Sequence, residues 1–124
     1  MSPAFEIGQQ LVGLCKEGKF EEAMEALYAP TIVSIEGQGS DEMPARIEGI
    51  DAVRKKGEWW YSNNEVHGTE TMGPYIGHRA DQFIVHFDMD ITPKDGERMH
   101  LKEVGLYTVA DGKVVQEEFL YLMG

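Results

Sequence analysis

Two glutamates near the carboxyl end of the chain have the spacing expected of paired acids in one pocket. Glu103 lies in the alternating segment RMHLKEVGLYTVA and Glu117 in KVVQEEFLYL, with ADG between the two segments. Such alternation predicts β-strands, and ADG is typical of a hairpin turn. If the turn has three residues, with Gly112 in the left-handed position, Val109 pairs with Lys113. Both glutamates then point to the face that carries the aromatic side chains.

This register pairs Gly105 with Glu117 and Glu103 with Phe119. A two-residue Asp-Gly turn would shift the pairing by one residue and bring Glu118 to the same face instead. We prefer the three-residue turn because it places the aromatic side chains together. In the preceding hairpin, a five-residue PKDGE loop after DQFIVHFDMDIT brings opposite charges together across the strands. The pairs expected there are Thr92–Arg98, Asp90–His100, Asp88–Lys102 and Phe87–Glu103.

Two carboxyl groups that share an apolar pocket push one of their pKa values upward. A neutral acid then lies beside an ionised base, and this arrangement suits proton transfer on a carbonyl compound. The alternative is structural: Arg46, Arg54 or Lys55 neutralises the pair in an ordinary ion-pair network, or the mouth of the pocket leaves both carboxyls solvated. Both interpretations stay open at this point.

Aromatic residues accompany the two acids and predict a pocket for a flat hydrophobic ligand. Taken singly, each of them also suits a hydrophobic core. The residues predicted to bind the ligand are Trp60, Tyr75, Tyr107, Phe119 and Tyr121.

Neither a metal site nor a bound cofactor is expected. The histidines and aspartates of the meander, His86, Asp88, Asp90 and His100, fall on the outer face of the predicted sheet and already form charge pairs there. The chain has no spacing typical of zinc ligands and no glycine-rich phosphate loop or dinucleotide fingerprint.

Length and charge narrow the classes of partner. The 124 residues predict one domain over residues 1–124, and the net charge of −11 argues against nucleic acid and anionic membranes as partners. Cys15 is the only cysteine and is expected to be a small buried hydrophobe. The first residues lack the pattern of a signal peptide and no apolar run is long enough to span a bilayer, so a cytoplasmic location is expected.

The order of predicted elements is helix, helix, strand, helix and four strands. Ser2-Pro3 begins the first helix and Gly18 ends it, the second helix stops at Pro30, and residues 31–36 form a short strand. Residues 37–48 are expected to be a flap-like loop, and a third helix covers about 50–63. A strand over 66–76, interrupted by Gly-Pro, leads into the meander. The fold class is therefore α+β, with three helices on one face of a curved sheet.

This order resembles the nuclear transport factor 2 fold, in particular the SnoaL-like polyketide cyclases and their relative ketosteroid isomerase. The resemblance lies in the segments LYAPTIVSIEG, RIEGIDAVRKKGEWW and YTVADGKVVQEEFLY. It implies a cystatin-like α+β roll in which a mixed sheet wraps around the helices to form a conical cavity, and it implies a dimer through the outer sheet face.

The resemblance also implies site residues. The position of the isomerase's catalytic base falls on Glu36, which keeps a carboxylate. The two donors of the isomerase's oxyanion hole fall on about Leu11 and Gly105, and both are missing. The same mechanism on a steroid is therefore not expected.

Two functions fit this sequence. The first is small-molecule binding of the SnoaL-like type, with acid/base chemistry on a hydrophobic carbonyl compound, in which Glu36 is the base and Glu103 or Glu117 the acid. The second is a non-catalytic, homodimeric binding or structural module with an inert cavity. In either case a homodimer is expected, because the outer sheet face carries several apolar side chains. These are Val104, Leu106, Val114, Leu120 and Leu122.

Overall fold

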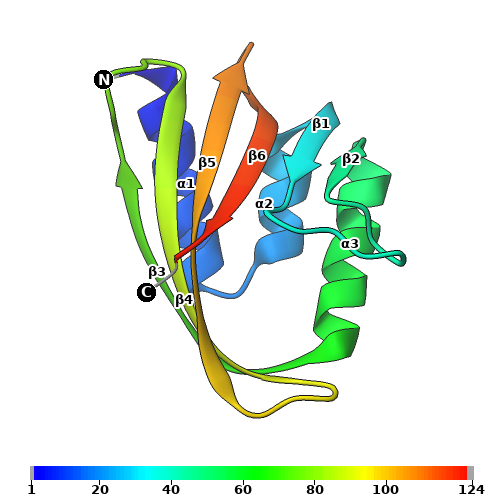
Figure 1. Cartoon of the computed structure of the whole chain (residues 1–124). Coiled ribbons are helices and arrows are strands. Elements are labelled where there is room, and N and C mark those ends of the chain that lie inside the picture. Colours follow the sequence, from blue (N-terminus) through cyan, green and yellow to red (C-terminus); the bar gives the residue numbers. More distant parts are fainter. Residues whose placement is uncertain (1, 123–124) are drawn as a thin grey trace.

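A single curved sheet organises residues 2–122, the part of the chain that the computed structural model describes (Figure 1). Its strands follow the order β2-β1-β6-β5-β4-β3, with β1 and β6 parallel and the other neighbouring strands antiparallel. The elements are α1 (Pro3–Lys16), α2 (Phe20–Leu27), β1 (Tyr28–Ile35), β2 (Arg46–Glu48), α3 (Ile50–Asn63), β3 (Asn64–Tyr75), β4 (Gln82–Pro93), β5 (Met99–Ala110) and β6 (Lys113–Tyr121). The predicted α+β class and the mixed sheet wrapped around helices are confirmed.

The helices begin and end where local chemistry favours it. The Ser2 hydroxyl accepts a hydrogen bond from the Phe5 amide at the start of α1, and Gly18, with φ of 74°, follows its end. The first strand begins earlier than expected, at Tyr28. The predicted loop over 37–48 also contains the short strand β2, which pairs with β1.

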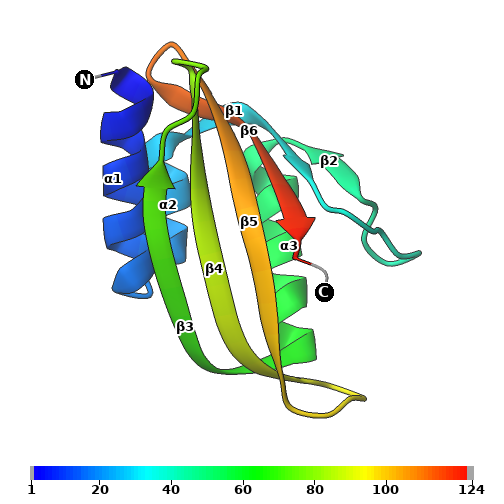
Figure 2. The same cartoon turned by 60° about the vertical axis from the view of Figure 1, so that its left-hand side comes forward.

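The helices lie on the concave side of the sheet, and its convex side faces the viewer in Figure 2. Helix α1 packs against β3 and β4, and the approach is so close that a Cβ at Gly8 would lie 2.8 Å from Pro74 Cβ and 3.0 Å from the Phe83 ring. Helix α3 packs against β1, β2 and β3. The layers therefore enclose a space between α3 and the long strands of the meander.

The first hairpin of the meander has the predicted register, with Asp90 opposite His100, and Phe87 opposite Glu103. The predicted turn of the second hairpin is wrong. Ala110 pairs with Lys113, so the turn has two residues, and Asp111 and Gly112 both have positive φ (51° and 76°). Such a turn matches the twist of the flanking strands.

The faces of β6 nevertheless agree with the prediction from Gln116 onward. The register shifts between Thr108 and Val109, which face Gln116 and Val114, so Val115 is an extra residue in β6. This bulge offsets the shorter turn, and Tyr107 faces Glu117 while Gly105 faces Phe119. Val114 was expected on the outer face, but it lies on the inner side of the bulge and is fully buried in the core.

Candidate active site

A cavity of about 760 Å³ lies between the concave sheet face and the helices. Its wall includes Glu36, Glu103 and Glu117, the three predicted acids. Glu36 directly follows β1, and the other two lie in β5 and β6, so the topology brings together residues that are far apart in the sequence. Most of the remaining wall is apolar or aromatic.

Glu117 is the most deeply buried of the three acids, with 3% of its surface exposed. The Tyr28 hydroxyl donates to its Oε1, and the Ser34 hydroxyl donates to its Oε2 over 2.6 Å. Both donors come from β1, which pairs in parallel with β6. The pKa of Tyr28 is raised well above its usual value, mainly by burial and secondly by the nearby Glu117 carboxylate. This phenol therefore remains a donor.

Lys56 is the cation that faces the acids. Its Nζ donates to the Ser34 hydroxyl, lies 3.4 Å from Glu36 Oε1 and is 5.1 Å from the centre of the Phe119 ring. Only 12% of its side chain is exposed, compared with 22% for Glu36. A continuous chain of contacts therefore links Tyr28, Glu117, Ser34, Lys56 and Glu36.

The cations predicted to neutralise the acids were the wrong ones. Arg46 pairs with Glu48, Arg54 pairs with Glu21, Glu25 and Asp51, and Lys55 is exposed. Helical spacing explains the difference, because Val53 is buried and the residues at three and seven positions beyond it share its face. Those residues are Lys56 and Trp60, which both line the cavity. The spacing from Val53 was the signal that could have identified Lys56.

Glu103 differs electrostatically from the other two acids. Its pKa is raised from 4.5 to about 7, mainly because the carboxyl is buried and secondly because Glu36 repels it. Attraction to Lys56 opposes this shift. Burial also raises the pKa of Glu36, but there the ion pair and hydrogen bonding with Lys56 oppose the shift. Within residues 2–122, Glu36 Oε2 is buried and accepts no hydrogen bond. The site thus holds an acid that is largely protonated below about pH 7 and a second glutamate with one free, buried oxygen.

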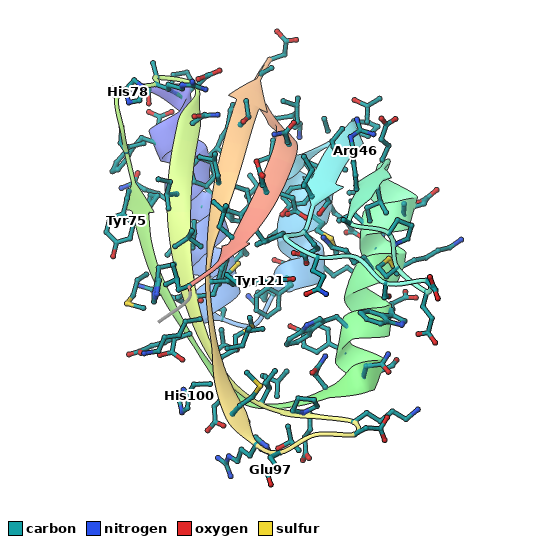
Figure 3. All side chains as sticks on the ribbon, viewed as in Figure 1. Arg46, Tyr75, His78, Glu97, His100 and Tyr121 are labelled. Atoms are coloured by element: carbon teal, nitrogen blue, oxygen red, sulfur yellow. The ribbon has the colours of Figure 1, made fainter. Side chains whose placement is uncertain are left out.

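The aromatic wall is largely as expected. Trp60, Tyr107, Phe119 and Tyr121 line the cavity, and the edge of the Tyr107 ring packs against Phe119 at a centroid distance of 6.2 Å. Tyr75, which was predicted to bind the ligand with them, does not line the cavity. It lies at the end of the edge strand β3, paired with the outward Ile84, and is 52% exposed. Figure 3 shows it at the sheet edge, far from Tyr121.

The two positions that match the oxyanion-hole donors of ketosteroid isomerase hold no hydrogen-bond donor side chain in this protein. Leu11 is a core residue, 2% exposed, although it touches the cavity. At Gly105 a Cβ atom would lie 2.7 Å from Tyr107 Cε2, so the tyrosine ring occupies the space of any side chain. Cys15 is buried as expected, and burial raises the pKa of its thiol to about 12.

A loop between β1 and β2 closes one side of the cavity. Gln38, Ser40 and Met43 line it from this loop. The loop is fastened to α3 because the Trp59 indole Nε1 donates to Glu42 Oε2 over 2.8 Å. The predicted flap therefore lies over the cavity as a covering segment.

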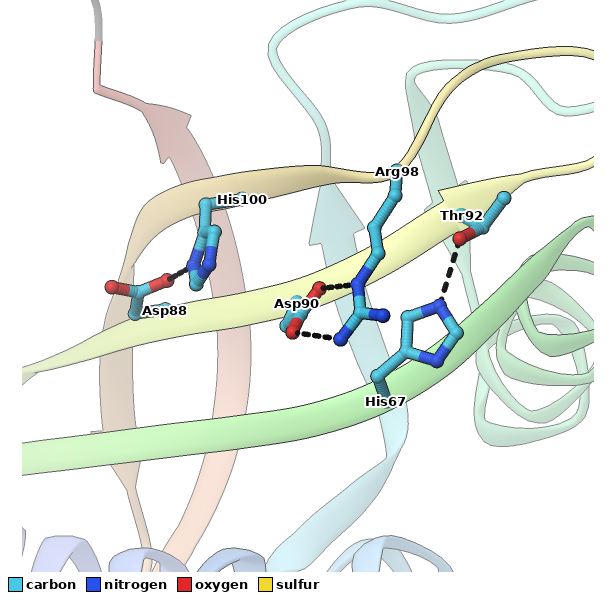
Figure 4. Close-up of polar contacts among 6 residues, drawn as sticks. All are labelled: His67, Asp88, Asp90, Thr92, Arg98 and His100. Carbon is cyan, nitrogen blue, oxygen red and sulfur yellow. Dashed lines mark hydrogen bonds and ion pairs between the residues drawn. The ribbon is translucent and has the colours of Figure 1, made fainter.

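The charged residues of the convex face form simple pairs (Figure 4). Arg98 donates to both oxygens of Asp90 over 3.0 and 2.8 Å, and His100 Nδ1 lies 2.9 Å from Asp88 Oδ1. The predicted partners, His100 for Asp90 and Lys102 for Asp88, are therefore each replaced by a neighbour. Among residues 2–122, no group of His, Cys, Asp or Glu side chains is arranged to hold a metal ion. None of the helices in this range is both long and apolar enough to cross a membrane.

The family model of the SnoaL-like domain matches residues 3–121. The chain belongs to this family. A crystal structure of a Mesorhizobium loti protein, described as a candidate SnoaL-like polyketide cyclase and also as a carbohydrate phosphatase, is 42% identical to this SnoaL-like domain. The match covers 94% of this chain and 97% of that chain, with a TM-score of 0.86.

More distant structures share the fold of this SnoaL-like domain. A candidate SnoaL-like polyketide cyclase from Jannaschia sp. CCS1 is 16% identical with a TM-score of 0.72, covering 98% of this chain and 89% of that one. TerC, co-crystallised with polyporic acid, is 15% identical with a TM-score of 0.74, covering 98% of this chain and 92% of its own. No curated protein matches this SnoaL-like domain.

Proposed function

We propose that this SnoaL-like domain binds a flat, hydrophobic carbonyl compound in its cavity and transfers a proton on it. The observation that carries the proposal is the unequal environment of two acids in one apolar cavity. Glu36 is paired with Lys56 and has a free, buried Oε2, whereas burial and repulsion raise the pKa of Glu103 to about 7. Acids whose pKa values are separated by their surroundings are the usual means of running acid and base steps together.

In this proposal Glu36 is the base. Its Oε2 takes a proton from the carbon next to the carbonyl, while Lys56 favours the ionised state of the carboxylate. Protonated Glu103 donates a hydrogen bond, or its proton, to the carbonyl oxygen as the enol forms. Glu36 then delivers its proton to a different carbon of a conjugated enol, and the oxygen returns any proton it took to Glu103, which restores the carbonyl and completes an isomerisation. Cyclisation and dehydration use the same first step.

Glu117 is assigned a positioning role and not that of the acid. Both of its oxygens already accept hydrogen bonds, from Tyr28 and Ser34. Ser34 in turn accepts from Lys56. Glu117 therefore orients the lysine that contacts Glu36 and has no free oxygen for a substrate. Trp60, Tyr107, Phe119 and Tyr121 form the walls that hold the ring system.

Exchange of carbon-bound hydrogen tests this proposal with a simple probe. We expect the protein to accelerate deuterium incorporation next to the carbonyl of 2-tetralone in D₂O near pD 6, followed by proton NMR. Glu36→Gln should lower the catalysed rate by about 100-fold or more, the range for loss of a general base. Glu48→Gln, which removes an exposed carboxylate from β2, serves as the control. An exchange rate equal to that of buffer would contradict catalysis and favour the non-catalytic binding module.

We also propose a homodimer through the convex sheet face, as the sequence led us to expect. The register places Val104 beside Leu120, and Ile84 between Tyr75 and Leu106. Leu120 and Tyr75 are 47% and 52% exposed. A contiguous patch of such large apolar side chains is unusual on a monomer and marks a contact surface.

Light scattering should therefore give a mass of about twice 13.9 kDa. Leu120→Arg places a charge at the centre of the proposed contact and should reduce the mass to that of one chain. A single-chain mass for the wild type at micromolar concentration would refute the dimer.

A further inference from the structure

A second hollow adjoins the cavity near the end of α1. This groove has a volume of about 600 Å³ and lies between the end of α1 and the first half of β3. Five residues line both spaces, so the two hollows share a wall: Cys15, Phe20, Glu21, Tyr61 and Thr69.

The groove exists because the helices leave part of the concave face uncovered. Thr69 pairs with Met89, which lines the cavity, so its side chain lies on the concave face. Two residues further along β3, Thr71 is buried with 5% exposure, but Thr69 is exposed. Helix α1 ends at Lys16 and β3 has a bulge between Val66 and Gly68. The concave face is therefore open to solvent at Thr69.

Aromatic rings mark the junction of the two hollows. Phe20 and Tyr61 lie with ring centroids 6.3 Å apart, and Tyr61 is half exposed. A ligand that passes between the cavity and the groove would contact both rings. Flat apolar groups suit this contact.

Beyond the rings, the groove carries charges of both signs. The carboxylates of Glu17 and Glu21 and the ammonium of Lys16 line it. Lys19 and Arg54, which pair with the two glutamates over 3.4 and 3.5 Å, lie outside the groove. Carboxylates accept hydrogen bonds and an ammonium donates them, and hydroxyl groups do both. A group of one charge would meet repulsion from part of this wall.

We propose that the groove is a second subsite, which holds the uncharged, hydroxyl-rich end of an elongated ligand whose flat apolar end lies in the cavity. The inference rests on the proposed function only in that the cavity must bind an apolar ring system. It does not require catalysis. The ligand class is thus an aromatic or other flat compound that carries a sugar-like or polyol substituent.

Val66 offers a way to close the groove without disturbing the cavity. It pairs with Ile91, a buried residue of the concave face, and it lines the groove but not the cavity. Val66→Phe should therefore fill the groove. Val115→Phe is the matched control, because Val115 is half-buried like Val66 and lines neither space.

Three fluorescent probes test the subsite: 2-naphthol, 2-naphthyl β-D-glucopyranoside and 2-naphthyl sulfate. We expect the wild type to bind the glucoside about tenfold more tightly than 2-naphthol, a gain of the order of one or two net hydrogen bonds. The sulfate should bind more weakly than the glucoside. Val66→Phe should abolish the glucoside's advantage and leave the Kd of 2-naphthol within about twofold, and Val115→Phe should change neither.

Lys16→Met provides a second, surface variant, which removes a donor from the groove wall and should weaken only glucoside binding. Equal affinity of the wild type for glucoside and naphthol, or equal losses for both probes in Val66→Phe, would overturn the subsite while leaving cavity binding intact. Failure of 2-naphthol and the glucoside alike to bind the wild type would remove the ligand-binding cavity itself, and the subsite with it.

Discussion

Glu103→Gln should become progressively more stable than the wild type as the pH rises from about 4.5 to about 7. The carboxyl of Glu103 has a folded pKa of about 7 and an unfolded value of 4.5. A raised folded pKa adds stability below the unfolded value, and this contribution is lost as the pH rises through the folded value. The difference in pKa corresponds to about 3 kcal/mol. Glutamine cannot ionise, so the variant avoids this loss.

Urea unfolding at several pH values measures the effect. The free energy of unfolding of Glu103→Gln minus that of the wild type should increase across the interval and level off above pH 7. Glu97→Gln removes an exposed carboxyl from the turn between β4 and β5 and should leave the pH profile unchanged. A pH-independent difference for Glu103→Gln would mean that the carboxyl is solvated and that Glu103 is not the acid.

Lys56→Met should have the opposite pH dependence and lose stability as the pH rises. Attraction to Lys56 lowers the pKa of both Glu36 and Glu103, so its removal raises the folded pKa values of both acids. Their ionisation at higher pH then leaves two carboxylates in the cavity without the ammonium. We expect a loss of about 3 kcal/mol at pH 8, near the lower end of the range for breaking a buried pair. Below pH 4, where the carboxyls are protonated in both states, the difference should be small.

Carboxyl NMR titration checks the cause directly. In Lys56→Met the resonance of Glu36 should titrate at a higher pH than in the wild type, and Lys56→Arg should restore much of the difference. Lys55→Met removes the adjacent, exposed lysine and should alter neither titration. Unchanged titration of Glu36 in Lys56→Met would show that the lysine does not set its charge, and the assignment of Glu36 as a poised base would fail.

Local patterns in the sequence predicted most of the elements. The alternation around PKDGE determined the register of the first hairpin, because opposite charges and a short loop agree on one pairing. The second hairpin was harder to predict. Asp111-Gly112 forms a two-residue turn, and the extra residue Val115 restores the faces of β6. This extra residue was not predicted, and the predicted faces were right only because it offset the wrong turn.

The polar core of the site was not predicted, because it depends on contacts between distant segments. Tyr28 was assigned to the second helix and Ser34 to a plain strand, yet both donate to Glu117 across the parallel pairing of β1 and β6. No local pattern specifies that pairing. Lys56 was overlooked in favour of its neighbour Lys55, although its spacing from Val53 and Trp60 indicated the inner face of α3.

The parallel contact between β1 and β6 also determines when the site can form during folding. The partners of Glu117 lie 89 and 83 residues earlier in the chain. During synthesis the helices and β1 emerge long before the strand that carries this carboxylate. Pairings across such long loops form slowly, because the entropy of closing the loop is lost before the contacts compensate for it. The helices and the first hairpin can therefore assemble early, whereas the acid network has to wait for β6, and a folding intermediate without β6 would have neither a complete sheet nor a complete cavity wall.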